Sequence, residues 1–147
     1  MAEKRKKTVN ESEIINGKNS LAVILKKATE NLYYISETDA EFEPFFGRTA
    51  SAVTKEELLR QTGKSPDEKI EERDFRQIFE RLTKIQDWYG EEETATVEKF
   101  ARLRKILLEK LRDLKVFKVG RIELDIYFVG LDEDGKLAGV KTKAVET

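Results

Sequence analysis

Residues 122–145, IELDIYFVGLDEDGKLAGVKTKAV, decide the fold class of this chain. Apolar side chains occupy every second position in the first part of this stretch: Ile122, Leu124, Ile126 and Phe128. A two-residue period of this kind predicts a β-strand. The sequence Asp132-Glu133-Asp134-Gly135 has the composition of a turn, and residues 137–145 are then expected to form a returning strand. With a short strand expected at residues 116–120, the segment predicts a C-terminal meander of strands.

Four segments before this meander have the pattern of helices. Ser20 is expected to cap the first helix, in which apolar side chains recur at three- and four-residue spacing. Thr54, three residues before Glu57, has the position of a capping box, and Asp74 is the expected cap of the third helix. The fourth and longest helix is expected at residues 91–114, with an acidic first turn that suits the helix dipole.

Between the first two helices, residues 42–46 are expected to form a strand. Pro44 lies within this strand and has no backbone N–H, so the strand is expected at the edge of a sheet. Because the helices mostly precede the strands instead of alternating with them, the sequence predicts an α+β fold. In such a fold helices cover an antiparallel or mixed sheet.

The length of 147 residues is that of one domain. We expect residues 20–147 to form this domain and residues 1–19 to form a flexible, polar tail. The tail contains the basic cluster Lys4-Arg5-Lys6-Lys7, which is also typical of targeting or nucleic-acid-binding segments. No apolar signal region follows the cluster, and no apolar run approaches the length of a membrane span. A cytoplasmic protein without membrane contact is therefore expected.

The sequence contains neither histidine nor cysteine. It therefore has no disulfide bond, no thiol nucleophile and no Ser–His–Asp triad, and it lacks the usual ligands of zinc. Carboxylates, lysines, tyrosines and hydroxyls are the remaining groups for catalysis, a small set for an enzyme that works near neutral pH. The composition thus favours a protein that acts by binding over an enzyme.

Three motifs that resemble ligand sites have ordinary structural explanations. Asp132-x-Asp134-Gly135 lacks the first ligand of a calcium-binding EF-hand loop and has Lys141 in place of its glutamate, so a hairpin turn is favoured. Glu91-Glu92-Glu93 would point in different directions from a helix, which disfavours a Mg²⁺ site. Gly63-Lys64-Ser65 follows a helix and lacks the first glycine of a P-loop.

Charge is distributed unevenly although the net charge is only −1. Residues 37–43 carry four acidic and no basic side chains, residues 86–98 carry five and none, and residues 99–118 carry eight basic against two acidic side chains. If the two acidic segments lie side by side, they form a patch for a basic partner; otherwise they belong to a solvated surface. Trp88 stands in the second acidic segment, where it is either a core anchor or a binding hot spot.

Several short motifs occur along residues 20–147 in a specific order and spacing. They are Ile35-Ser36-Glu37, Gln61-Thr62-Gly63, Gln86-Asp87-Trp88-Tyr89, Val119-Gly120, Glu123-Leu124-Asp125, Leu137-Ala138-Gly139 and the ending Thr142-Lys143-x-Val145-Glu146-Thr147. In this arrangement the chain resembles the nuclease A inhibitor family, whose members block sugar-non-specific nucleases of the ββα-metal class. The resemblance implies a three-layer α/β/α sandwich, no enzymatic activity and no cofactor. Residues 43–54 and the long tail depart from the family's pattern.

The resemblance also implies which residues bind the nuclease. Glu37 would place a carboxylate where the scissile phosphate lies and so act as a phosphate mimic. Thr147 would reach the partner nuclease's Mg²⁺ with its hydroxyl or terminal carboxylate, in the complex only. Gln86, Asp87 and Trp88 would contact nuclease arginines that normally hold phosphate. Arginine binds carboxylate as it binds phosphate, through two parallel hydrogen bonds, and Mg²⁺ prefers oxygen ligands.

The leading hypothesis is therefore a protein inhibitor that forms a heterodimeric complex with a Mg²⁺-dependent endonuclease acting on DNA or RNA. The alternative is a non-enzymatic adaptor that binds another basic protein through the same acidic patch. An enzyme that uses clustered carboxylates with Mg²⁺ is disfavoured, because no spacing in the sequence gathers three acidic residues on one face. Direct nucleic-acid binding through residues 1–7 and the basic helix is disfavoured as well.

Overall fold

The computed structural model describes residues 17–147 as a set of helices and strands. The basic cluster Lys4–Lys7 and the rest of the predicted tail up to residue 16 lie outside the described residues. The elements, in chain order, are α1 (Gly17–Thr29), β1 (Tyr33–Ile35), β2 (Asp39–Glu41), β3 (Glu43–Thr49), α2 (Lys55–Gln61), β4 (Ile70–Arg73), α3 (Phe75–Leu82), α4 (Glu91–Lys110), β5 (Arg112–Gly120), β6 (Glu123–Leu131) and β7 (Lys136–Val145).

Five strands form one antiparallel sheet in the order β3-β7-β6-β5-β4. The predicted C-terminal meander is confirmed as β5-β6-β7, and the predicted edge strand is confirmed as β3, which contains Pro44. The turn after β6 is closed by Asp132, whose carboxylate accepts hydrogen bonds from the backbone N–H groups of Asp134 and Lys136 at 2.8 and 3.0 Å. Strands β1 and β2 form a separate hairpin beside this sheet.

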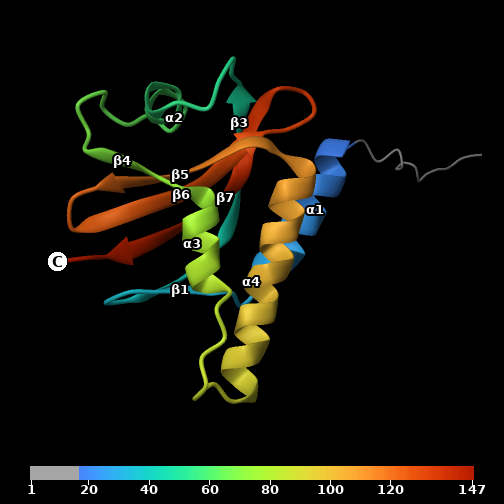
Figure 1. Ribbon diagram of the computed structural model, residues 1–147. Coiled ribbons are helices and arrows are strands. Elements are labelled where there is room, and N and C mark those ends of the chain that lie inside the picture. Colours follow the sequence, from blue (N-terminus) through green and yellow to red (C-terminus); the bar gives the residue numbers. More distant parts are fainter. Residues whose placement is uncertain (1–16) are drawn as a thin grey trace, which may run out of the picture.

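Helices cover both faces of the five-stranded sheet (Figure 1). On one face α1, α3 and α4 pack over the larger core, in which Phe79 and Leu103 cluster with Phe128. On the other face α2 places Leu58 and Leu59 in a smaller core. Because successive side chains of a strand point to opposite faces, the central strands supply both cores. The α+β class is confirmed, with its layers arranged as α/β/α.

The predicted helix caps are confirmed at two of three positions. The hydroxyl of Thr54 accepts a hydrogen bond from the backbone N–H of Glu57 at 3.1 Å, and α2 begins directly after it. The carboxylate of Asp74 accepts from the N–H groups of Arg76 and Gln77 at 2.8 and 3.2 Å. The prediction for Ser20 was wrong, because α1 begins at Gly17 and Ser20 lies inside the helix.

Two further element boundaries differ from those predicted. Helix α4 ends at Lys110 and not at residue 114, and β5 begins at Arg112 and not at residue 116. Leu111, between the two elements, is already extended, and Asp113 inside β5 has a φ of 57° in the left-handed region, where the pairing with β6 shifts its register. Leu111 continues the apolar stripe of α4 and is buried, so the stripe alone gives no sign that the helix has ended.

Candidate functional site

The turn between β1 and β2 lies against the end of β7. The backbone N–H of Glu37 donates to the carbonyl of Val145 at 3.3 Å, and the N–H of Val145 donates to the hydroxyl of Ser36 at 3.0 Å. Thr147 then donates twice to Oε2 of Glu37, from its backbone N–H at 3.0 Å and from its hydroxyl at 2.6 Å. Glu37 and Thr147, 110 positions apart in the sequence, thus form one hydrogen-bonded unit, the Glu37–Thr147 pair.

Glu146 fixes the same segment from the other side. Its backbone N–H donates to the carbonyl of Ile122 at 2.9 Å, and its carboxylate accepts from Nζ of Lys118 at 3.0 Å. Lys118 lies in β5 and is buried, so the ion pair provides a partner for a charge that has left water. Residues 145–147 are therefore held by the β1–β2 hairpin on one side and by the central strands on the other.

The carboxylate of Glu37 is exposed and is stabilised in its ionised form. The hydrogen bond from the Thr147 hydroxyl, and secondly the one from the Thr147 N–H, hold the pKa of Glu37 below its usual value of 4.5. Both bonds reach Oε2, and no residue in the described part of the chain donates to Oε1. One oxygen of this carboxylate therefore remains available to an external donor.

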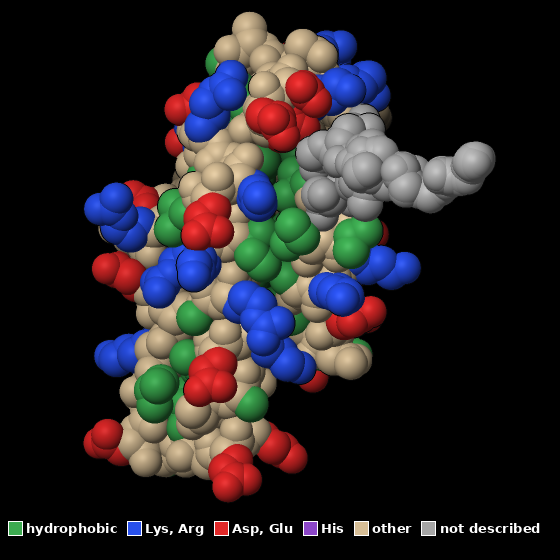
Figure 2. Space-filling model, turned by 90° about the vertical axis from the view of Figure 1, so that its right-hand side faces the viewer, with side chains coloured by type: hydrophobic (Ala, Val, Ile, Leu, Met, Phe, Trp, Pro, Cys, Tyr) green, Lys and Arg blue, Asp and Glu red, His purple; other side chains and the backbone are tan. Residues whose placement is uncertain are grey.

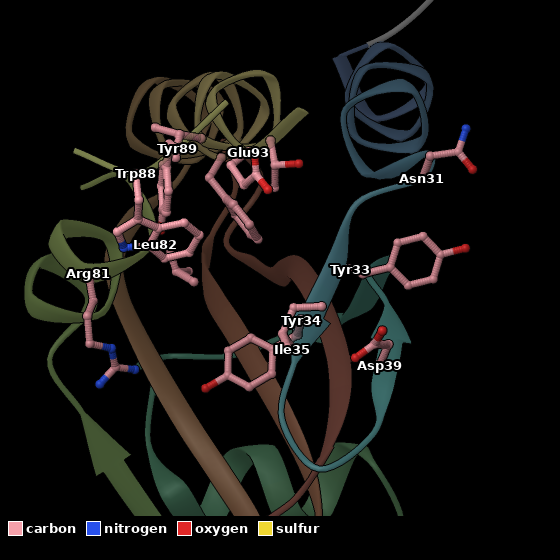
Figure 3. Close-up of a pocket in the computed structure, with 13 residues that line it drawn as sticks. Asn31, Tyr33, Tyr34, Ile35, Asp39, Arg81, Leu82, Trp88, Tyr89 and Glu93 are labelled. Carbon is pink, nitrogen blue, oxygen red and sulfur yellow. The ribbon is translucent and has the colours of Figure 1, made fainter. Parts of the chain in front are cut away.

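Trp88 lies in the connection between α3 and α4, where it is 73% exposed. Its ring packs edge-to-face on Tyr89, with the ring centroids 4.6 Å apart. A cavity of about 500 Å³ separates this connection from the β1–β2 hairpin, and Ile35 and Asp39 line it on the hairpin side (Figure 3). The hairpin that carries Glu37 and the loop that carries Trp88 therefore both line this cavity.

The structure places the five predicted site residues in two groups. Glu37 and Thr147 are in direct contact at the hairpin turn. Gln86, Asp87 and Trp88 lie together in the α3–α4 connection, where the carbonyl of Gln86 accepts from the N–H of Tyr89 at 3.1 Å. Trp88 lines the cavity next to the hairpin, whereas Gln86 and Asp87 do not.

The two predicted acidic segments approach each other at this cavity, since Asp39 and Glu93 both line it. Acidic side chains gather at the end of the molecule where α4 begins, and basic side chains follow along the middle of the helix (Figure 2). The basic segment at residues 99–118 does not form a single face, because it is divided between α4 and β5 and because Lys118 is buried against Glu146.

Within residues 17–147, no three acidic side chains are arranged so that they could hold a metal ion. The carboxylates of the acidic end are instead distributed over several elements. None of the helices in this part of the chain is long and apolar enough to cross a membrane.

The family model for nuclease A inhibitor-like proteins matches residues 19–147, which include every element described above except the first two residues of α1. The chain belongs to this family. The match confirms the resemblance seen in the short motifs, and it implies a nuclease inhibitor. A comparison with curated proteins gave no match.

For a member of the nuclease A inhibitor-like family, the structure adds residues that sequence reasoning gave no role. Ser36 and Glu146 hold the segment that ends at Thr147, and Lys118 holds Glu146. Ser36 and Glu146 occur in the motifs that carry the resemblance to the family, and this occurrence could have indicated that they have a role in the site. Lys118 gave no signal, because a lysine inside an apolar strand pattern does not reveal its partner.

Proposed function

We propose that this protein inhibits a Mg²⁺-dependent, sugar-non-specific nuclease of the ββα-metal class by occupying its active site. The proposal rests on family membership and on the Glu37–Thr147 pair. The pair combines a carboxylate with a hydroxyl at an exposed position, and hydrogen bonds fix both groups before a partner arrives. Such preorganisation lowers the entropy lost on binding.

In the proposed complex, Oε1 of Glu37 occupies the place of a non-bridging phosphate oxygen. Arginine side chains of the nuclease donate to it, because a guanidinium group binds a carboxylate in the same planar manner as a phosphate. The hydroxyl of Thr147 donates a hydrogen bond to Glu37, so its oxygen keeps lone pairs with which to bind the nuclease's Mg²⁺, a metal that prefers oxygen ligands. The inhibitor contains no phosphodiester and so is not cleaved.

Gln86, Asp87 and Trp88 supply the second part of the proposed contact. The amide and carboxylate oxygens of Gln86 and Asp87 accept hydrogen bonds from arginine, and the exposed ring of Trp88 offers a face on which a guanidinium group stacks. The acidic end of the molecule attracts a nuclease active site that is positively charged for binding nucleic acid.

The experiment that tests the proposal is a titration of such a nuclease with this protein at fixed Mg²⁺. The remaining nuclease activity is measured as the rate at which nucleotides are released from the nucleic-acid substrate. We expect complete inhibition at one inhibitor per nuclease. Glu37→Gln should weaken inhibition by at least about tenfold, because it removes the charge that meets arginine and metal. Glu56→Gln is the matched control, since Glu56 is exposed on α2 at the opposite face of the sheet.

Absence of inhibition by a micromolar excess, across several nucleases of this class, would contradict the proposal. Calorimetry that compares the affinity for the nuclease with and without a chelator distinguishes an active-site inhibitor from the adaptor alternative. An active-site inhibitor that contacts Mg²⁺ should bind the metal-free nuclease more weakly, whereas an adaptor that recognises a basic surface should bind it equally well.

A further inference from the structure

Large apolar side chains are exposed at seven positions of the described chain, and they are not evenly spread. Ile35, Trp88 and Ile122 are 68%, 73% and 55% exposed. Each comes from a different segment: the β1–β2 hairpin, the α3–α4 connection and the turn before β6. Single exposed apolar side chains are common in soluble proteins, so their arrangement and not their number is informative.

Two of these residues, Ile35 and Ile122, adjoin the Glu37–Thr147 pair. Ile35 is the last residue of β1 and is separated from Glu37 by Ser36 alone. The carbonyl of Ile122 accepts the hydrogen bond from Glu146, the residue before Thr147. Ile35 and Ile122 are thus each linked to the residue that directly precedes a member of the pair: Ile35 to Ser36, by the chain, and Ile122 to Glu146, by a hydrogen bond.

Trp88 lies across the cavity from Ile35, in the α3–α4 connection. Trp88 and Tyr89 line the cavity on the α3–α4 side, and Tyr33, Tyr34 and Ile35 line it on the hairpin side, so both walls carry aromatic rings (Figure 3). The cavity volume of about 500 Å³ is that of a small binding pocket. One wall of the cavity belongs to the hairpin whose turn carries Glu37.

We propose that Ile35, Trp88 and Ile122 form an apolar collar that seals the Glu37–Thr147 pair from water when the nuclease binds. This inference rests on the proposed function and adds a requirement for the partner, whose charged active site must be bordered by apolar side chains. Removal of water strengthens the ionic contacts at the centre, since the same charges interact more strongly in a medium of lower dielectric constant. Binding sites in which a few contacts dominate commonly have such a surrounding ring.

Charge argues for this occupant over a second copy of the chain. Asp39 and Glu93 line the cavity, and Glu37 lies in the turn of the hairpin that carries Asp39. Two copies that met through this end would bring these carboxylates together, and like charges at an interface are costly. A partner with a basic, metal-containing centre has the opposite charge and fits the same surface.

The test measures by calorimetry how tightly the nuclease binds the variants Ile35→Ser and Ile122→Ser. Each measurement is made at about 0.1 M and at about 1 M salt, because the Debye length falls from about 10 Å to about 3 Å between these concentrations. Each variant should weaken binding by about tenfold at both salt concentrations, because the lost contact is apolar. Val23→Ser and Leu108→Ser are the matched controls, with 56% and 58% exposure on α1 and α4, and should bind like the unaltered protein.

If the collar variants and the control variants bind the nuclease equally well, the proposed role of the collar is contradicted. The proposed function is not contradicted by this result, because the unaltered protein would still inhibit the nuclease. A loss at the collar that disappears at about 1 M salt would also contradict the proposed role of the collar, because the contact would then be ionic. Sedimentation of the free protein provides the last check, since a dimer that Ile35→Ser dissociates would assign the collar to a second copy. Failure of the proposed function is distinct, because the unaltered protein would then not bind the nuclease at all.

Discussion

Glu37 shows how a single exposed carboxylate can be given a defined position. A surface glutamate normally samples several rotamers, and their loss on binding costs free energy. Here Thr147 donates two hydrogen bonds to one oxygen, and the turn backbone is bonded to Val145. The carboxylate is therefore charged, oriented and still half available to a partner, which are the properties that a phosphate mimic needs.

The contribution of the Thr147 hydroxyl can be measured in the free protein. Thr147→Val removes the hydroxyl and keeps the shape, so the pKa of Glu37 should rise towards its usual 4.5, because the largest cause of its lowering is lost. Thr147→Ser keeps the hydroxyl and should leave the pKa low. An NMR titration of the Glu37 side chain measures both values. Equal pKa values in the two variants would contradict the role assigned to this hydroxyl.

The same pKa sets the expected pH dependence of binding. A lowered pKa means that the ionised form is stabilised, so Glu37 stays charged above pH 4.5 and is neutralised only as the pH falls through its lower value. Affinity for the nuclease should then be lost in that acidic range. In Thr147→Val the loss should begin at a higher pH than in Thr147→Ser.

At the scale of elements, the first part of β5 contains one unusual backbone conformation. Asp113 has a φ of 57°, within an irregular part of the pairing between β5 and β6. Asp113→Gly should be tolerated, because glycine adopts this conformation freely. Asp113→Val should lower the free energy of unfolding by about 1–2 kcal/mol relative to Asp113→Gly, because a β-branched side chain is strained there. Urea denaturation measures the difference.

Asp67→Val is the control for this comparison. Asp67 is an exposed loop residue in the described chain and does not have a positive φ. A similar loss of stability at Asp67 and Asp113 would show that the exposed valine, and not the left-handed backbone, is responsible.

The predictable elements are those with a long, regular pattern. The stripe of α4 places Val97, Phe100, Leu103 and Leu107 in the interior, as expected. Strand β4 was missed because Ile70 is followed by Glu71, Glu72 and Arg73, which are exposed at a sheet edge and show no alternation. The end of α4 was missed because a buried residue stands at Leu111 whether the chain continues as helix or as strand.

The candidate site was less accessible to local reasoning than the fold. No spacing rule connects Glu37 with Thr147, whose contact depends on the pairing of distant strands. Only the resemblance to a family indicated that they act together. The exposed positions of Ile35 and Ile122 were also hidden, because apolar residues at the ends of alternating strands look the same in sequence whether they face the core or the solvent.

At the scale of the whole molecule, the near-zero net charge conceals a division of charge along α4. Glu91, Glu92 and Glu93 are exposed at the start of α4, next to the connection that carries Trp88. The basic side chains of the same helix lie further along it (Figure 2). A molecule with such a division is oriented by the field of a basic partner before contact, which accelerates association.

This orientation predicts an effect on the association rate that differs from the effect of the collar. Glu91→Gln combined with Glu92→Gln should slow association with the nuclease by about threefold at low salt, and the difference should vanish at high salt, because the removed charges act over a distance. Stopped-flow mixing measures the rate. Glu56→Gln combined with Glu133→Gln is the control, because it removes the same charge from exposed positions on α2 and in the β6–β7 turn. If both double variants slow association equally, net charge and not its location governs the encounter.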